Sequence, residues 1–385
     1  MDTQPRGVAI VGIGETPNAR HLPKEMSALL IDAILMACED AGIAPAELDG
    51  VVTESFTMPT ELSEVALTLG MKPDAFVAHV AFSGAGTVAA PELAAMAIET
   101  GRATNVVCFF GAKYGSLAGG PFSFHGADPL KANFELPYGL FPQPAYMALM
   151  AQRYLEEFGY SQEDFAHVAM TSRAWAAMHP TATKREGLTL DQYLQSPMVA
   201  APLRNADCAL LSDGAAAFIM TSAERARDLR QRPVVTASVA HTYDPISMHA
   251  HLAVREDMLS LPSKVSGPLA LERAGMSIHD IDLFEVYDCF SIIPLVTLED
   301  MGLHERGAAL DGYVKGEMAP GGSTPVNTHG GLTAHSYLLG ITHFNEAVAQ
   351  LRGDAGERQV PGAQHALVTG WASNEMSTCI LTNDL

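Results

Sequence analysis

A chain of 385 residues is long enough for one large hydrophobic core or for two domains of ordinary size, and its 48% hydrophobic and 17% charged residues exclude a disordered chain. The formal net charge of -21 excludes a nucleic-acid partner, because phosphate binding requires clustered Lys and Arg. No uncharged apolar run reaches about 18 residues, so we expect no membrane span.

The five cysteines are widely separated, and the sequence has neither a Cys-x-x-Cys pair nor a His-Glu-x-x-His motif. We therefore expect no disulfide framework and no metal site. A reducing cytoplasm is the simplest setting for such a chain. Cys38, Cys108 and Cys379 fall in apolar runs, and we expect them to be buried, inert thiols.

The N-terminal part of the chain predicts a βαβ arrangement. Short apolar runs predict buried strands at residues 7–13, 51–53, 77–80 and 105–111. Helical periodicity over residues 26–41 predicts a helix that ends at Gly42. A second helix, over residues 87–99, is rich in Ala and other small residues, which predicts close packing in the middle of the fold.

Residues 114–198 differ from their surroundings. The predicted helices of this segment carry large side chains such as Tyr154 and Trp175, and Pro and Gly interrupt its middle. We expect an insertion that covers the core and shapes a pocket, with residues 122–134 as a flexible lid. A further buried strand is expected within residues 206–221.

The second half of the chain repeats the order of elements in the first half. A strand at residues 283–286, a glycine turn at 330–331, a helix over 340–351 and a strand at 365–369 follow one another. Such a duplication predicts two similar α/β halves with the active site between them. We place the N-terminal half at residues 1–223, including the insertion, and the C-terminal half at residues 224–385.

The stretch from Glu285 to Ser291 (EVYDCFS) lies where strand-like residues run into a helical pattern. Open α/β sheets place their chemistry at such turns, because the carboxyl ends of strands open into the ligand crevice. Cys289 could be taken for a nucleophile at this turn, but we expect it to be a packing residue.

Four stretches of sequence together resemble the thiolase superfamily, specifically the sterol-carrier-protein type thiolases. They are VAIVGIGETP, MVAAPLRNADCALLSDGAAAFIMTSAERA, IDLFEVYDCFS and NTHGGLTAHSYLLGITHFNEAVAQLRG. The likeness covers nearly the whole chain. It implies a five-layered αβαβα thiolase fold with a helical insertion or lid, CoA-thioester substrates and a homodimer.

The chain departs from this family where thiolase chemistry is carried out. Thiolases use a cysteine in a Cys-x-Ser-Gly turn to form a covalent thioester, and the matching turn here begins with Ala81. The family has two further motifs, His-Asp-Cys-Phe and Gly-His-Pro-Leu-Gly. In this chain Tyr287 and Tyr337 stand where these motifs have their histidines. Residues 370–376 (GWASNEM), where a second cysteine belongs, contain none. Random decay would seldom give Tyr at both histidine positions, so we expect changed chemistry.

Two facing phenols can still move protons. Retro-aldol cleavage of a β-hydroxyacyl-CoA requires a proton to leave the hydroxyl, the C–C bond to break and the thioester enolate to be protonated. In this the chain is similar to the steroid side-chain-cleaving aldolases of the superfamily. That resemblance implies a 17-hydroxy steroid side-chain CoA ester as substrate, cleaved to a ketone and a short acyl-CoA such as propionyl-CoA. It also implies a small partner with an OB fold and a zinc ribbon, which together with the chain forms a heterotetramer.

The expected catalytic residues are Tyr287 and Tyr337, with Tyr337 as the base on the hydroxyl, although the two roles could be exchanged. Substrate-binding residues are expected at Ser83, Gly84, Gly331 and His335. No metal and no cofactor beyond the CoA thioester of the substrate is expected. Two alternatives stay open: a non-catalytic acyl-CoA or lipid-binding homologue, and a hydrolase that cleaves β-diketones.

Overall fold

The computed structural model describes residues 7–54, 62–80, 83–117, 131–140, 143–244, 257–372 and 374–384. Position Ala81 and most of the expected lid at residues 122–134 lie outside these ranges. Within them, no helix is both long and apolar enough to cross a membrane.

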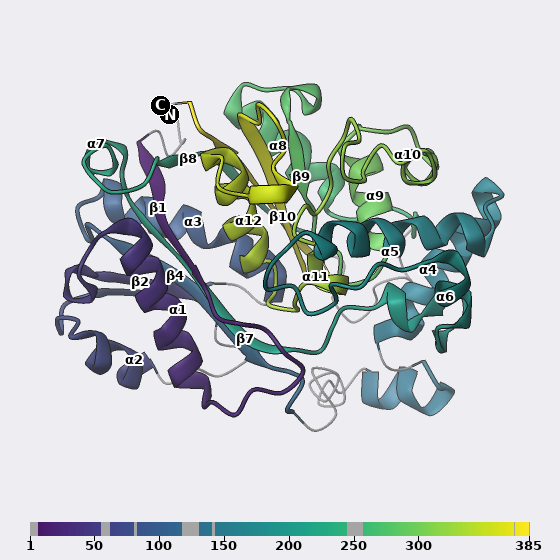
Figure 1. Cartoon of the computed structure of the whole chain (residues 1–385), viewed down its shortest axis with the longest axis horizontal. Coiled ribbons are helices and arrows are strands. Elements are labelled where there is room, and N and C mark those ends of the chain that lie inside the picture. The colour runs from purple at the N-terminus through teal and green to yellow at the C-terminus, as the bar shows by residue number, and fades with distance from the viewer. Residues whose placement is uncertain are drawn as a thin grey trace.

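Nine strands form one extended sheet in the order β3-β2-β4-β7-β1-β8-β11-β10-β9 (Figure 1). The strands of its first part are β1 (Val8–Glu15), β2 (Gly50–Thr53), β3 (Phe76–His79), β4 (Val106–Lys113) and β7 (Asp213–Ser222). Those of its second part are β8 (Val234–Tyr243), β9 (Leu283–Glu285), β10 (His365–Ala372) and β11 (Glu375–Thr382). A separate two-stranded sheet joins β5 (Met198–Ala200) to β6 (Leu203–Arg204).

The two parts of the sheet have the same topology. In the first, β2 is parallel to β4, which is antiparallel to β7, which is antiparallel to β1. In the second, β9, β10, β11 and β8 repeat these relations in the same order. The parts meet where β1 and β8 pair through two residue pairs, Ala9 with Val235 and Ile10 with Val234. This repeat accords with an internal duplication, and the boundary at residue 223 stays a prediction.

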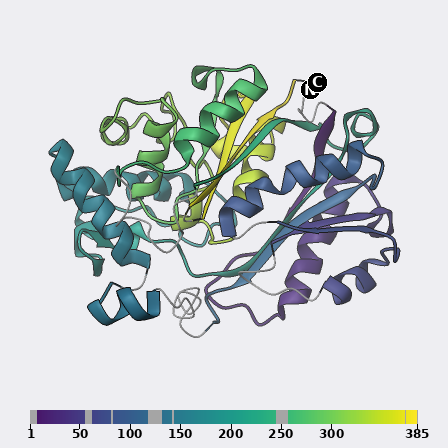
Figure 2. The ribbon, with the colours of Figure 1, turned by 180° about the vertical axis from the view of Figure 1, so that it is seen from behind.

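The helices complete five layers. They are α1 (Met26–Ala41), α2 (Leu62–Leu69), α3 (Ser83–Glu99), α4 (Gln143–Phe158), α5 (Gln162–Ala177), α6 (Leu190–Gln195), α7 (Ala223–Ala226), α8 (Ser263–Ala274), α9 (Ile292–Asp300), α10 (Ala309–Lys315), α11 (Gly331–Ala334) and α12 (Ile341–Arg352). Helix α1 packs on the outer face of the first part of the sheet, and α8 packs on that of the second. Helices α3 and α12 contact both parts and lie between them. Figures 1 and 2 show α1 and α3 on opposite sides of the first strands.

The small residues of α3 are what allow it to lie in the middle layer. Most of its residues are buried, as its sequence predicts, and it begins at Ser83, four residues before the expected start. A Cβ on Gly370 of β10 would lie 1.9 Å from the carbonyl oxygen of Gly84. The backbones of α3 and β10 therefore approach more closely than any larger side chain allows.

Helices α4, α5 and α6 belong to the predicted insertion and lie at one end of the molecule (Figure 1). Helix α4 packs on α9, and α5 packs on α10 and α11. The indole N–H of Trp175 on α5 donates a 2.8 Å hydrogen bond to the carbonyl of Met318. Large aromatic residues thus attach the insertion to the second half of the chain.

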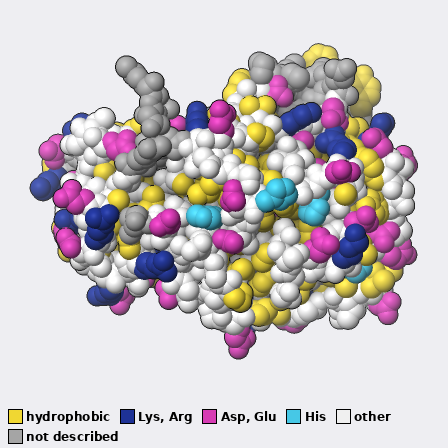
Figure 3. All heavy atoms as spheres, turned by 90° about the horizontal axis from the view of Figure 1, so that it is seen from above, with side chains coloured by type: hydrophobic (Ala, Val, Ile, Leu, Met, Phe, Trp, Pro, Cys, Tyr) yellow, Lys and Arg dark blue, Asp and Glu magenta, His cyan; other side chains and the backbone are white. Residues whose placement is uncertain are grey.

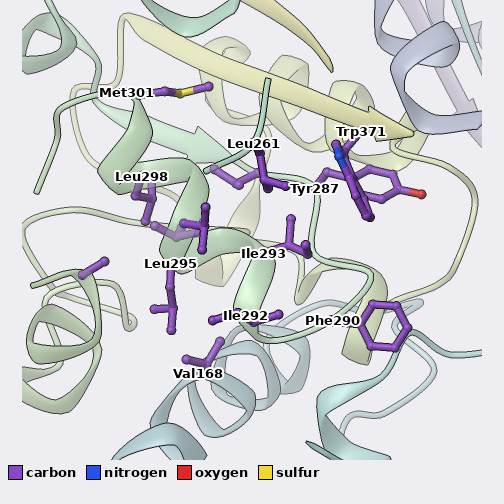
Figure 4. Packing of buried hydrophobic residues seen from close by; sticks show 14 of the residues in the cluster. Val168, Leu261, Tyr287, Phe290, Ile292, Ile293, Leu295, Leu298, Met301 and Trp371 are labelled. Atoms are coloured by element: carbon purple, nitrogen blue, oxygen red, sulfur yellow. The ribbon is translucent and has the colours of Figure 1, made fainter. Parts of the chain in front are cut away.

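A cluster of buried aliphatic and aromatic side chains surrounds α9 (Figure 4). Tyr287 and Trp371 both belong to this cluster. Its hydroxyl points away from the aliphatic residues of α9. The core thus holds the ring of Tyr287 in place, while its hydroxyl lies outside the aliphatic part of the cluster.

The charged surface follows from the composition. On the face shown in Figure 3, Lys and Arg side chains are interspersed with Asp and Glu, and they form no continuous basic area there.

Replacing Gly14 with Ala is expected to destabilise the fold. A Cβ at Gly14 would lie 2.2 Å from the carbonyl oxygen of Ala33 on α1, so helix and strand would have to separate. We expect the free energy of unfolding, measured by urea denaturation, to fall by about 1–3 kcal/mol. Gly187→Ala is the control, because nothing lies within 4 Å of a Cβ there. Equal stability of the two variants would contradict the close packing of α1 on β1.

Candidate active site

Tyr287 and Tyr337 are brought together by the fold. Tyr287 follows β9, and Tyr337 lies between α11 and α12. The two side chains pack in the same cluster, and each phenol influences the pKa of the other. Tyr287 is 1% exposed, whereas Tyr337 is partly exposed. The two residues that the sequence singles out therefore form one unit.

The two phenols are not equivalent. Burial raises the pKa of both, well above the ordinary value for Tyr287. The nearby Tyr337 adds to the rise in the pKa of Tyr287, whereas Tyr287 opposes the rise in that of Tyr337. Both phenols are neutral at pH 7, and the oxygen of Tyr337 is the more easily deprotonated of the two.

Hydroxyl side chains from the two halves hold the backbone of the pair. The backbone N–H of Tyr287 donates to Oγ1 of Thr369 on β10, and that of Tyr337 donates to Oγ of Ser212 beside β7, each at 2.9 Å. Asn327 forms two further bonds, of 2.7 and 2.8 Å, with the backbone N–H and carbonyl of Val286. Because Thr369, Ser212 and Asn327 are buried, both tyrosines have fixed positions.

The first residues of α3 pack against the ring of Tyr287. A Cβ on Gly84 would lie 2.3 Å from Cε2 of that ring, so only glycine fits there. Ser83, which precedes it, has a φ of 60°, and Leu339, just before α12, has a φ of 50°. Left-handed backbone at non-glycine residues is uncommon and concentrates at functional sites. Here it occurs at the starts of both central helices.

The other predicted substrate-binding residues lie among buried carboxylates. A Cβ on Gly331 would lie 2.0 Å from Oδ2 of Asp288, which also accepts a 2.7 Å bond at Oδ1 from the backbone N–H of Leu332. The Nε2 atom of His335, which is fully buried, lies 3.1 Å from Oε1 of Glu15. Substrate contacts at Ser83, Gly84, Gly331 and His335 stay predictions.

Sequence reasoning missed Tyr114 and Glu54. The ring centroids of Tyr114 and Tyr337 lie 5.3 Å apart at an interplanar angle of 34°. The buried hydroxyl of Tyr114 has no hydrogen-bond partner among the described residues, and burial raises its pKa, followed by the nearby Tyr337 and Glu54. Glu54 accepts a long 3.5 Å bond from the backbone N–H of Ser83. Both follow parallel neighbouring strands, β4 and β2, and this position at the carboxyl ends could have revealed them.

None of the five cysteines is activated as a nucleophile. Burial raises the pKa of each thiol, to about 11 for Cys38 and about 12 for Cys208. For Cys289, burial and then the charge of Asp288 raise the pKa well above its ordinary value. The expected burial of Cys38, Cys108, Cys289 and Cys379 is confirmed. The site therefore offers phenols for proton transfer and no thiolate for acyl transfer.

Replacing Gly84 with Ala is expected to displace the ring of Tyr287, because the new methyl group would overlap it. We expect at least a tenfold loss in the turnover of a β-hydroxyacyl-CoA, since small displacements of reacting groups cost much rate. Circular dichroism checks that the fold is kept, and Gly187→Ala again is the control. Wild-type turnover in a folded Gly84→Ala protein would contradict this placement of Tyr287.

Comparisons with known proteins agree with the fold and the site. Residues 246–383 match the family model described as thiolase C-terminal domain-like. The chain is 32% identical over 381 residues to a 17-hydroxy-3-oxo-4-pregnene-20-carboxyl-CoA lyase of Mycobacterium tuberculosis, covering 97% of this chain and 98% of that protein. It is 33% identical over 395 residues to a steroid side-chain-cleaving aldolase of Thermomonospora curvata, covering both chains fully.

A solved structure of an Ltp2-ChsH2(DUF35) aldolase superposes with a TM-score of 0.90 at 31% identity, covering 98% of this chain and 97% of that one. The five-layered thiolase fold is thereby confirmed. The similarity extends along the whole chain, and the chain belongs to the thiolase superfamily as one of its aldolases, which are carbon–carbon lyases.

Proposed function

We propose that the neighbouring phenols of Tyr287 and Tyr337 carry out the retro-aldol cleavage of a β-hydroxyacyl-CoA. The observation that carries this proposal is the pair itself, held between the two halves of a thiolase fold whose cysteine thiols are all protonated. Acyl transfer needs a thiolate, whereas retro-aldol cleavage needs only proton transfer and a stabilised enolate.

The substrate is a 17-hydroxy steroid with a CoA-thioester side chain. The name of the M. tuberculosis relative specifies such a compound for that protein, and full-length similarity supports the same class here. Cleavage yields a 17-ketosteroid and propionyl-CoA. Thiolytic cleavage requires a ketone at the β-carbon, and a tertiary alcohol there cannot be oxidised to one. The C–C bond of this substrate is therefore cleaved by a retro-aldol step instead.

The neutral Tyr337 accepts the proton of the β-hydroxyl and passes on its own phenolic proton as the C–C bond breaks and the ketone forms. The electron pair of that bond moves onto the thioester as an enolate, whose α-carbon receives the proton that Tyr337 passes on. Tyr287 keeps its proton, because burial and Tyr337 raise its pKa, and donates a hydrogen bond to the enolate or to the departing carbonyl. One proton leaves the hydroxyl and one reaches the enolate, so both phenols stay neutral. The reaction is redox-neutral and uses no cofactor beyond the CoA of the substrate.

The chain acts in the cytoplasm as a homodimer with a small partner that has an OB fold and a zinc ribbon, two of each chain forming a heterotetramer. The solved Ltp2-ChsH2(DUF35) aldolase, in which the aldolase is named together with a DUF35 protein, supports a partner for this chain. An exposed sheet edge supports the homodimer: β3 is the outermost strand, and its Val77 is 52% exposed. Unpaired edges of this kind readily pair with a second chain.

Tyr337→Phe is expected to lower the turnover of the β-hydroxyacyl-CoA by about 10²–10⁴-fold, because the loss of one positioned proton-transfer group has this effect. The affinity for substrate, measured by calorimetry, should change little. Tyr160→Phe is the control, because Tyr160 lies in the insertion and its hydroxyl bonds to the carbonyl of Gly307, away from the tyrosine pair. Unchanged turnover in Tyr337→Phe would leave the pair without a catalytic role.

The wild-type protein separates the two alternative functions. If it binds the ester without cleaving it, a ligand-binding homologue is supported. If it cleaves a β-diketone with uptake of water, a hydrolase is supported.

Co-expression with a DUF35 protein tests the assembly. Light scattering after gel filtration should give the mass of two copies of each chain. A charged residue in place of Val77 should halve that mass, because it would disrupt the pairing of β3 edges. An unchanged mass in this variant would contradict the proposed dimer contact.

A further inference from the structure

Three buried side chains that the proposed reaction does not use converge next to the active site. Glu285 is the last residue of β9, His329 lies in the turn before α11, and His343 lies in the first turn of α12. Each is at most 1% exposed. One oxygen or nitrogen atom from each lies within 4.8 Å of those of the other two.

The polar atoms of these residues are poorly satisfied by the protein. Both ring nitrogens of His329, both of His343 and Oε2 of Glu285 have no hydrogen-bond partner among the residues that the structure describes. Nδ1 of His329 lies 2.9 Å from Oε2 of Glu285, yet neither atom is directed at the other in a hydrogen bond. Buried imidazoles and carboxylates are normally bonded, so five such atoms in one place indicate a missing common partner.

The separation of these atoms fits ligands of one metal ion. Two ligands about 2.0–2.1 Å from a tetrahedral zinc ion lie about 3.3 Å from each other and are directed at the ion. The 2.9 Å separation of His329 and Glu285 is close to this value. The candidate ligand atoms all lie within 4.8 Å of one another, so a small rotation of one side chain would bring all three to a single ion.

We propose that Glu285, His329 and His343 bind one divalent transition-metal ion, for which Zn²⁺ is the best match. Two imidazoles and one carboxylate are ligands of Zn²⁺ and its neighbours in the first transition row, whereas Mg²⁺ and Ca²⁺ prefer oxygen ligands alone. The sequence contains no signal for this site, because its ligands come from three separate elements and follow no known motif spacing.

The surroundings leave the right atoms available. Oε1 of Glu285 accepts two 2.9 Å bonds from the N–H and hydroxyl of Thr328, so Oε2 is left for the ion. Nε2 of His343 lies 3.5 Å from Oδ1 of Asp288 without a hydrogen bond, so neither ring nitrogen of His343 is used by the protein among the described residues.

Charge also favours a cation here. Glu346 is paired with Arg358 through contacts of 2.8 and 2.9 Å. Among the described residues, Glu285 has no Lys or Arg partner and lies beside His329 instead.

The ion would have a structural role. Glu285 lies two residues before Tyr287, and His329 and His343 lie on either side of Tyr337 in the chain. An ion at this site would therefore tie together the strand end and the two segments that carry the tyrosine pair. Since the ligands are buried, the ion would enter during folding, and its binding would add to the stability of the folded state.

Metal analysis of the full-length chain tests the proposal directly. The wild-type protein, expressed with added Zn²⁺ and then desalted, should contain about one zinc ion per chain by mass spectrometry. Glu285→Gln and His343→Gln should each hold less than about a tenth of that. His179→Gln is the matched control, because His179 is also buried and touches His335 but lies outside the three ligands, and it should keep its zinc. If the chain has to be purified with a partner that itself contains zinc, the result is the difference in zinc content between the wild-type and the variant complex.

A second measurement covers variants that fail to fold. Wild-type chain that is unfolded and refolded in a chelator should melt several degrees lower than chain refolded with Zn²⁺, and added Zn²⁺ should restore the melting temperature on a further refolding cycle. Wild-type protein that retains less than about a tenth of an ion of any transition metal after refolding with Zn²⁺ would overturn the proposal. Equal zinc in wild type and in folded His343→Gln would also overturn it, because the metal would then lie elsewhere.

Discussion

The close approach of Tyr287 and Tyr337 is the constraint on which the proposed chemistry depends, because it brings together two separate turns of the C-terminal half. Tyr287 follows β9 and Tyr337 precedes α12. Each backbone N–H is held by a buried hydroxyl, Thr369 for one and Ser212 for the other. A pair that is fixed in this way needs no rearrangement before it moves a proton.

Close backbone packing makes this position possible. Gly84 lets the ring of Tyr287 rest on the start of α3, and Gly370 lets β10 approach the same turn. Side chains larger than that of glycine do not fit where these backbones approach each other. Small residues therefore fill the centre of this large protein. The buried core around α9 then holds the ring of Tyr287 from its other side (Figure 4).

The sequence alone predicted much of the fold, because periodicity and the glycine at Gly42 are local signals. It also predicted both tyrosines, through their positions in two motifs, and their pairing followed from the resemblance that those motifs carry. Tyr114 and Glu54 were missed because the sheet brings them to the site by pairing β2 with β4, and no local pattern encodes that pairing. The same holds for Glu285, His329 and His343, which only tertiary packing brings together.

Isotope labelling tests the central claim most directly. When the steroid CoA ester is cleaved in D₂O containing ¹⁸O, protonation of an enolate places one deuterium on the α-carbon of the released acyl-CoA and leaves its thioester intact. The account predicts this product, in equal amount to the ketone, with no free CoA. Release of a free acid that carries ¹⁸O, or an acyl-CoA without deuterium at the α-carbon, would contradict retro-aldol cleavage by the tyrosine pair.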